Sequence, residues 1–233
     1  MRRTISAIVA SAVVLSVVAC GDSTMSPTQA TAKTSAPSAA AFSSTAASYA
    51  RLVPNSVDFD ITPSGGTVNV AGLFTLDFPA NSVCDPSTSG YGPGTWDTAC
   101  TPATGTIHEH ATLSASAAGI RVDFGTPIRF VPTRNVTIST SIFASVLRSS
   151  AAFYASHPSS SSPVSIVYDP SLSAAGVNDA LGDPSLATFI DYRAGTVSRR
   201  IKHFSGYGSA WGDGVCDPNV PNDPDCAPPP QGQ

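Results

Sequence analysis

Two histidines on either side of a glutamate are the most direct candidate for metal chemistry. In Ile107-His108-Glu109-His110-Ala111, a β-strand would place His108 and His110 on one face, about 7 Å apart. Imidazoles at this spacing could bind Zn²⁺ or Cu²⁺. The apolar neighbours would take the opposite, core-facing side, so both histidines would lie in solvent. Because no third ligand is identifiable, we interpret them as exposed polar residues and predict no metal or other cofactor; a surface metal site is the alternative.

Glu109 has the parity of the core-facing residues in this run. A buried carboxylate needs a partner. We therefore expect Glu109 to lie near a sheet edge or to pair with an arginine.

Cysteine is the second residue type that could do chemistry. Besides Cys20, the chain has Cys84, Cys100, Cys216 and Cys226, which allow three pairings. Neighbouring cysteines would close two Gly/Pro-rich loops, so we expect disulfides Cys84–Cys100 and Cys216–Cys226. A Cys₄ metal site is disfavoured because no CxxC pair occurs. Residues 213–233 are then expected to be a disulfide-closed acidic loop followed by a disordered tail; Ca²⁺ binding by its carboxylates is the alternative.

The N-terminus reads as an export signal. Arg2 and Arg3 precede the apolar run from Ile5 to Val18, which is short for a membrane span. Val17-Val18-Ala19-Cys20-Gly21 resembles the lipobox of bacterial lipoproteins. The resemblance implies a signal peptide over residues 1–20 and lipid on Cys20, which would hold the protein on a membrane. Gly21 after the cysteine favours the outer membrane. An ordinary signal peptide or a short anchor helix is the alternative.

Composition changes along the rest of the chain. Residues 21–51 are rich in Ser, Thr, Ala and Pro, which predicts a disordered tether. Beyond residue 52 apolar and polar residues alternate, as in Val57-Asp58-Phe59-Asp60-Ile61. Glutamate and lysine are nearly absent, and turn formers are frequent, so few helices are expected. No basic patch suggests a nucleic-acid partner.

The alternating runs predict an all-β fold, a two-sheet antiparallel β-sandwich over residues 52–212. One stretch, 144–154, favours a short helix. The predicted strands are 57–61, 68–70, 74–78, 107–113, 120–124, 128–130, 136–142, 164–168, 188–192, 196–204 and 208–211.

Several motifs of this region resemble ZU5-like domains. The opening Gly65-Gly66-Thr67-Val68 and the later Phe78-Pro79-Ala80-Asn81-Ser82-Val83 resemble the start of that domain. Ile201-Lys202-His203-Phe204-Ser205-Gly206-Tyr207 resembles the closing strand of bacterial secreted members. The resemblance spans roughly residues 56–212, and the Cys84–Cys100 insert departs from it. It implies a β-sandwich without activity on a separate substrate.

The resemblance also raises self-cleavage as an alternative, because His-Phe-Ser marks autoproteolysis in some ZU5-containing signalling proteins. Carried over, Ser205 would attack the Phe204 carbonyl and His203 would act as base. The interpretation that we prefer is structural: His203 is a hydrogen-bonded, partly buried histidine, while Phe204 and Tyr207 close the sandwich.

These observations favour a membrane-anchored bacterial envelope lipoprotein that is not an enzyme and acts as a binding or structural module. Its partner would be an envelope protein or a glycan. Tyr91 and Trp96, the aromatics of the Cys84–Cys100 loop, are the candidate contact residues. The alternative for this pair is a small local core under the loop.

Overall fold

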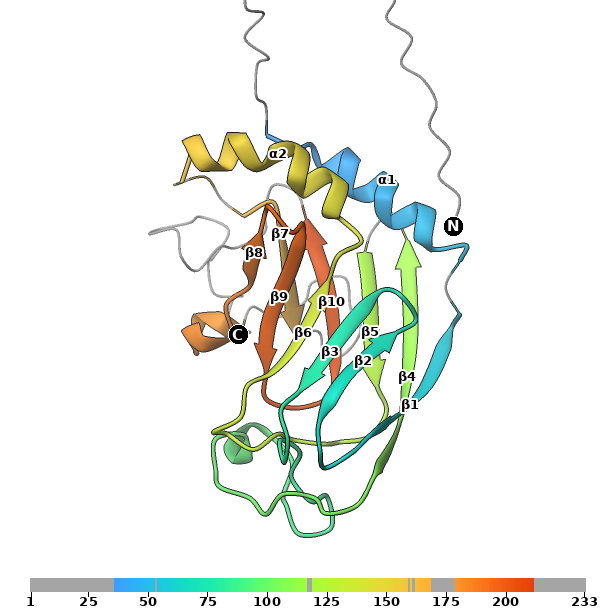
Figure 1. Cartoon of the computed structure of the whole chain (residues 1–233), viewed down its shortest axis with the longest axis vertical. Helices are drawn as coiled ribbons and strands as arrows, with labels where there is room; N and C mark the ends of the chain where they lie inside the picture. The colour runs from blue at the N-terminus through green and yellow to red at the C-terminus, as the bar shows by residue number, and fades with distance from the viewer. Residues whose placement is uncertain are drawn as a thin grey trace, which may run out of the picture. The chain divides into compact units, whose positions relative to one another are not determined.

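The computed structural model describes residues 36–52, 54–116, 119–158, 160, 162–168 and 179–211. Cys20, Cys216 and Cys226 lie outside the described residues, so the predicted lipid attachment and the predicted disulfide Cys216–Cys226 fall outside it. The described part has two five-stranded antiparallel sheets packed against each other, which confirms the predicted all-β sandwich (Figure 1).

The first sheet has the order β1-β4-β5-β10-β7 and the second has the order β2-β3-β6-β9-β8. The strands of the first sheet are β1 (Ser56–Ile61), β4 (Ile107–Ser116), β5 (Gly119–Phe124), β10 (Gly206–Trp211) and β7 (Val164–Tyr168). Those of the second are β2 (Gly66–Val70), β3 (Phe74–Phe78), β6 (Val136–Thr140), β9 (Thr196–Ile201) and β8 (Phe189–Asp191). In the connections that the structure describes lie three short 3₁₀ turns, η1 (Pro93–Thr95), η2 (Asp179–Leu181) and η3 (Pro184–Leu186).

Phenylalanine rings from both sheets fill the centre of the core. Phe204 stacks on Phe124, with ring centroids 4.2 Å apart. It meets three further rings edge-on, those of Phe59, Phe78 and Phe130. Phe204 and Tyr207 are each only 1% exposed, which confirms their predicted role in closing the sandwich. Such aromatic packing contributes beyond simple area burial.

Two predicted strands differ from the structure. The run 128–130 makes isolated bridges only, in which Phe130 pairs with Val83 and Arg129 with His203. The predicted strand 196–204 ends at Ile201, because the chain then crosses from the second sheet, where β9 lies, to the first, where β10 lies. His203-Phe204-Ser205 is therefore a corner between sheets rather than the end of a strand.

The segment predicted as a tether contains a helix, α1 (Ala39–Tyr49), which corrects the boundary drawn at residue 51. Phe42 and Ala46 lie four residues apart and are buried. Phe42 meets Phe143 edge-on at 5.3 Å, and the Trp211 indole N–H donates to Ser43 Oγ at 3.0 Å. The segment has too few large apolar residues to form a core of its own. Its helix instead packs against the sandwich, through Phe42 on Phe143 and Ser43 with Trp211.

A second helix, α2 (Ala144–Ser156), forms where a short helix was expected. Figure 1 shows α1 and α2 at one end of the sandwich and the loop that carries η1 at the opposite end. Within the described residues, no helix has the length and apolar character needed to cross a membrane.

Gly65, in the turn between β1 and β2, shows why glycine is needed at the start of Gly65-Gly66-Thr67-Val68. Its φ is +73°, and an added Cβ would collide with the backbone of Phe78 and Pro79. Only glycine combines this conformation with so close an approach. The turn carries the chain from the first sheet to the second.

Candidate functional site

A disulfide closes the loop between β3 and β4. Cys84 and Cys100 are bonded, with Cα atoms 5.7 Å apart, which confirms the predicted pairing. Inside the loop, Asp85 accepts hydrogen bonds from the backbone N–H and hydroxyl of Ser87, and Thr98 donates to the carbonyl of Thr95. The hydrogen bonds from Ser87 lower the pKa of the Asp85 carboxyl.

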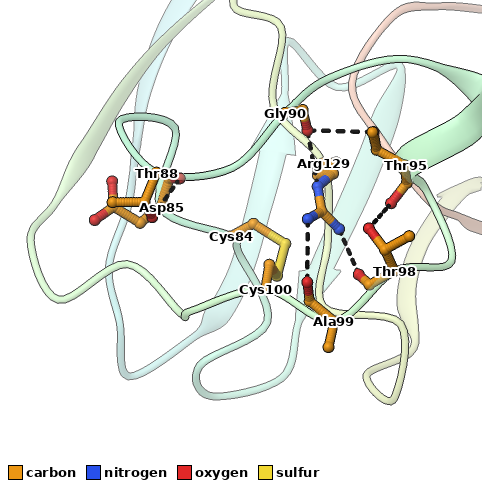
Figure 2. Close-up of a disulfide and its surroundings, with 9 residues drawn as sticks. All are labelled: Cys84, Asp85, Thr88, Gly90, Thr95, Thr98, Ala99, Cys100 and Arg129. Carbon is orange, nitrogen blue, oxygen red and sulfur yellow. Dashed lines mark hydrogen bonds between the residues drawn. A yellow bond between two sulfur atoms is a disulfide. The ribbon is translucent and has the colours of Figure 1, made fainter.

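A buried arginine donates hydrogen bonds to the same loop. Arg129 is 5% exposed, and its guanidinium donates to the carbonyls of Gly90 (2.9 Å), Thr98 (2.6 Å) and Ala99 (3.4 Å) (Figure 2). The fork of N–H groups thus satisfies three carbonyls that secondary structure leaves free. The sequence pointed to Arg129 only as a residue in a short strand, so this role was missed.

Lys202 fixes the loop to the neighbouring turn. Its ammonium lies 2.6 Å from both Asp97 in the loop and Asp183 at the start of η3, and its side chain is 11% exposed. Burial alone would lower the pKa of Lys202, but the hydrogen bonds to Asp183 and Asp97 raise it. The same hydrogen bond to Lys202 lowers the pKa of Asp183 to about 2.

His203 lies under the loop rather than at the surface. It is 1% exposed and stacks on Trp96, with centroids 3.7 Å apart and planes 20° from parallel. Tyr91 and Tyr168 meet the imidazole edge-on at 5.9 and 5.2 Å. Burial lowers the pKa of His203 to about 4, with Arg199 and Lys202 adding to the effect, while a hydrogen bond to the Phe204 carbonyl opposes it. His203 is therefore neutral at pH 7.

The carbonyl of Phe204 receives two donors. The Tyr91 hydroxyl donates to it, and His203 Nδ1 lies 3.3 Å away. The Tyr91 oxygen also lies 3.4 Å from both Ser205 Oγ and His203 Nδ1. Burial raises the pKa of Tyr91, so the phenol keeps its proton and can donate. We call Tyr91, Trp96, His203, Phe204 and Ser205 the corner site.

The corner site joins two features that the sequence presented separately, the loop aromatics and the His-Phe-Ser motif. Tyr91 is 41% exposed, so part of its ring faces solvent. Trp96 is half-buried, its indole nitrogen is buried, and His203 covers one face of its ring. Trp96 thus belongs to a local core under the loop, whereas Tyr91 is open to contact.

The other sequence-predicted pair lies on β4, which pairs with β1 and β5 in the first sheet. His108 and His110 face solvent, as expected, and each imidazole contacts an aspartate of β1. Glu109 points inward and is 2% exposed. Its Oε1 accepts the backbone N–H of Thr126 at 3.0 Å, and Oε2 has no partner among the described residues. Of the two alternatives expected for Glu109, the structure agrees with a place near a sheet edge, because β4 lies next to the edge strand β1. Its hydrogen-bond partner is the backbone amide of Thr126 and not an arginine, and burial raises the pKa of Glu109.

Comparison of the chain with models of known protein families, with curated proteins and with solved structures finds no match.

Proposed function

We propose that this protein is a non-enzymatic binding module of the bacterial cell envelope, held on the outer membrane by lipid on Cys20. The lipobox-like Val17-Val18-Ala19-Cys20-Gly21 supports the anchor. The Cys84–Cys100 disulfide agrees with export to an oxidising compartment. The contact surface is the outer side of the loop around Tyr91, and the partner is an envelope protein or glycan.

The observation that carries this proposal is the bracing of the loop. Three interactions fix the loop: the Cys84–Cys100 disulfide, the hydrogen bonds from the Arg129 guanidinium and the ion pair of the Lys202 ammonium with Asp97. A loop fixed in this way loses little conformational entropy when a partner binds. Tyr91 remains 41% exposed at its surface, and a rigid, half-exposed tyrosine is a typical anchor residue of binding interfaces.

Photo-crosslinking in cells tests the contact surface. Gly94 lies in the loop, and a Cβ there meets no atom within 4 Å, so a photoreactive phenylalanine analogue fits at this position. The same analogue at exposed Phe189 on β8 is the matched control. We expect an adduct of defined mass, or attachment to the cell-wall fraction, from position 94 only. Equal adducts from both positions, or none from position 94, would overturn the proposal.

Labelling with an alkyne analogue of palmitate tests the anchor. The wild-type protein should be labelled and sediment with the outer membrane, and Cys20→Ser should be neither labelled nor membrane-bound. Labelling that persists in Cys20→Ser would refute lipid attachment at this cysteine.

Self-cleavage is the second candidate, favoured by the two donors at the Phe204 carbonyl. Attack by Ser205 Oγ on the Phe204 carbonyl would form an ester and break the peptide C–N bond. The hydroxyl proton would pass to the nitrogen of Ser205, which becomes a free amine, and water would then hydrolyse the ester. The charge that develops on the carbonyl oxygen would be stabilised by the Tyr91 hydroxyl and His203. In this geometry His203 fits an oxyanion donor better than a base.

Denaturing mass spectrometry of the reduced protein separates the two candidates. β10 lies between β5 and β7, so a chain cut after Phe204 would stay assembled until it is denatured. Two fragments that meet at Phe204–Ser205, and one intact chain in Ser205→Ala, would establish cleavage. A single intact wild-type chain would exclude it and leave the binding role.

A further inference from the structure

The outer face of β1 and β4 carries two side-by-side histidine–aspartate pairs. The register places Asp58 opposite His110 and Asp60 opposite His108. In each pair the imidazole Nδ1 lies 2.6 Å from a carboxylate oxygen. The histidine side chains are nevertheless 82% and 55% exposed. No packing need explains this arrangement, because all four side chains point away from the core.

The carboxylates determine which imidazole nitrogen is available. An ionised carboxylate can only accept a hydrogen bond, so Nδ1 of each neutral histidine carries the proton. Nε2 then keeps its lone pair. Histidines that ligate metals usually donate their other N–H to a carboxylate or carbonyl in this way, which fixes the tautomer and makes the ligand more basic.

The spacing allows both Nε2 atoms to reach one ion. Residues i and i+2 of a strand are about 7 Å apart on the same face, whereas two nitrogens on one ion at about 2.1 Å are at most about 4 Å apart. The rings would therefore have to lean toward each other by about 3 Å in total, which is within the freedom of two exposed side chains.

We propose that His108 and His110 form a surface site for a divalent transition metal ion that prefers imidazole, with Asp58 and Asp60 as the carboxylates that orient the ligands. Among the described residues, no group of three or more His, Cys, Asp or Glu side chains is placed to hold a metal ion. The described residues therefore supply two ligands, and water completes the coordination.

The chemistry of this set selects the metal. Two neutral nitrogens disfavour Ca²⁺ and Mg²⁺, which take oxygen ligands. Affinity of a nitrogen site for divalent ions rises to Cu²⁺ and is lower for Ni²⁺ and Zn²⁺. Cu²⁺ also tolerates two protein nitrogens and two waters in a tetragonal plane. The two nearby aspartates add negative charge that attracts the cation. The site lies on the β1–β4 face and does not depend on the binding role of the loop.

Titration of the purified full-length protein with CuCl₂, NiCl₂ and ZnCl₂, followed by calorimetry and by electron paramagnetic resonance for copper, tests this site. We expect one Cu²⁺ per chain with two equatorial nitrogen ligands, and weaker binding of Ni²⁺ and Zn²⁺. His108→Ala or His110→Ala alone should weaken Cu²⁺ binding at least tenfold, and the double variant should abolish the two-nitrogen signal.

His157, a single exposed histidine at the end of α2, provides the matched control, and His157→Ala should bind Cu²⁺ like the wild type. Asp58→Asn with Asp60→Asn should weaken binding about tenfold while the signal from two nitrogens persists. Wild-type affinity in the double histidine variant would overturn the site. A loss only when both histidines are replaced would overturn shared coordination of one ion, and wild-type affinity in the double aspartate variant would overturn the orienting role. The four residues replaced at the site, Asp58, Asp60, His108 and His110, lie on an exposed face. Equal thermal unfolding of the metal-free variants therefore serves as the folding check.

Discussion

At the scale of single residues, Arg129 is a buried side chain that donates hydrogen bonds to three backbone carbonyls. Replacing it by methionine keeps a similar volume but removes the Arg129 donor from the carbonyls of Thr98 and Ala99, while the Gly90 carbonyl keeps the Thr95 hydroxyl as a donor. We expect the free energy of unfolding to fall by about 3 kcal/mol, measured by urea denaturation. Arg134→Met, at an exposed arginine a few residues away, should change it by less than about 0.5 kcal/mol. Equal effects of the two substitutions would contradict the role given to Arg129.

The sequence predicts which way single residues face better than it predicts their partners. Alternation placed His108 and His110 outward and Glu109 inward, and the structure agrees. Their partners depend on the register between β1 and β4, which joins positions 48 and 52 residues apart. Nothing in a single strand encodes that register, so the pairs with Asp58 and Asp60 could not be foreseen.

At the scale of elements, the Cys84–Cys100 loop is a unit whose order depends on its disulfide. Cys84→Ser with Cys100→Ser releases a loop of this length and should lower the free energy of unfolding by about 3 kcal/mol. Trp96 should also leave His203 and become exposed. In a Trp211→Phe background, where Trp96 is the one remaining tryptophan, its emission should shift to the red. An unchanged spectrum would show that Arg129 and Lys202 hold the loop without the disulfide.

Helix α1 is the element whose role the sequence concealed. Phe42→Ala should lower the free energy of unfolding by about 3 to 4 kcal/mol, because the ring is 1% exposed and packs on Phe143. Leu52→Ala, just beyond the helix and 79% exposed, is the control and should change it by less than about 0.5 kcal/mol. Chemical denaturation measures both. A small effect of Phe42→Ala would show that α1 does not pack stably on the sandwich and belongs to the tether.

The limit on predicting elements is one of context. The Cys84–Cys100 pairing follows from proximity along the chain, and the strands follow from alternation. The Ser/Thr/Ala composition of residues 39–49 suits a disordered tether as well as a helix. The helix is stabilised by packing against the sandwich, where Phe42 meets Phe143, and this packing cannot be seen in the local composition. The contact of Tyr91 with His203 joins residues 112 positions apart, so the corner site emerges only when the chain folds.

At the scale of the whole molecule, the sandwich follows from the number and spacing of alternating runs, whereas the crossing between sheets does not. β9 and β10 are adjacent in sequence and belong to different sheets, and Phe204 fills the space between those sheets. Alternation along a single run does not show where the chain leaves one sheet for the other, so the corner at His203-Phe204-Ser205 could not be foreseen from it.

Burial of His203 makes the stability of the whole molecule depend on pH. Its pKa falls from 6.5 in the unfolded chain to about 4 in the folded protein. Below pH 6.5 His203 binds a proton in the unfolded state but not in the folded state. Its contribution to the free energy of unfolding is therefore fully present above this pH and is lost as the pH falls toward 4. Between pH 7 and pH 4.5 this costs about 2 kcal/mol. In His203→Asn this contribution to the loss should disappear, so urea denaturation curves at the two pH values should differ by about 2 kcal/mol less than in the wild type.

The contribution of Glu109 to stability changes with pH in the opposite direction to that of His203, so Glu109 serves as the internal control for that measurement. Because burial raises its pKa in the folded protein, the folded state takes up a proton more readily, and Glu109 contributes stability as the pH falls. Glu109→Gln should therefore lose stability on acidification more steeply than the wild type, while His203→Asn loses it less steeply. Asp183, with a pKa of about 2, releases its stabilising interaction with Lys202 only below pH 4, outside this window. If His203→Asn and the wild type had parallel profiles between pH 7 and pH 4.5, the imidazole would accept protons in the folded protein, and the loop would not exclude water from the corner site.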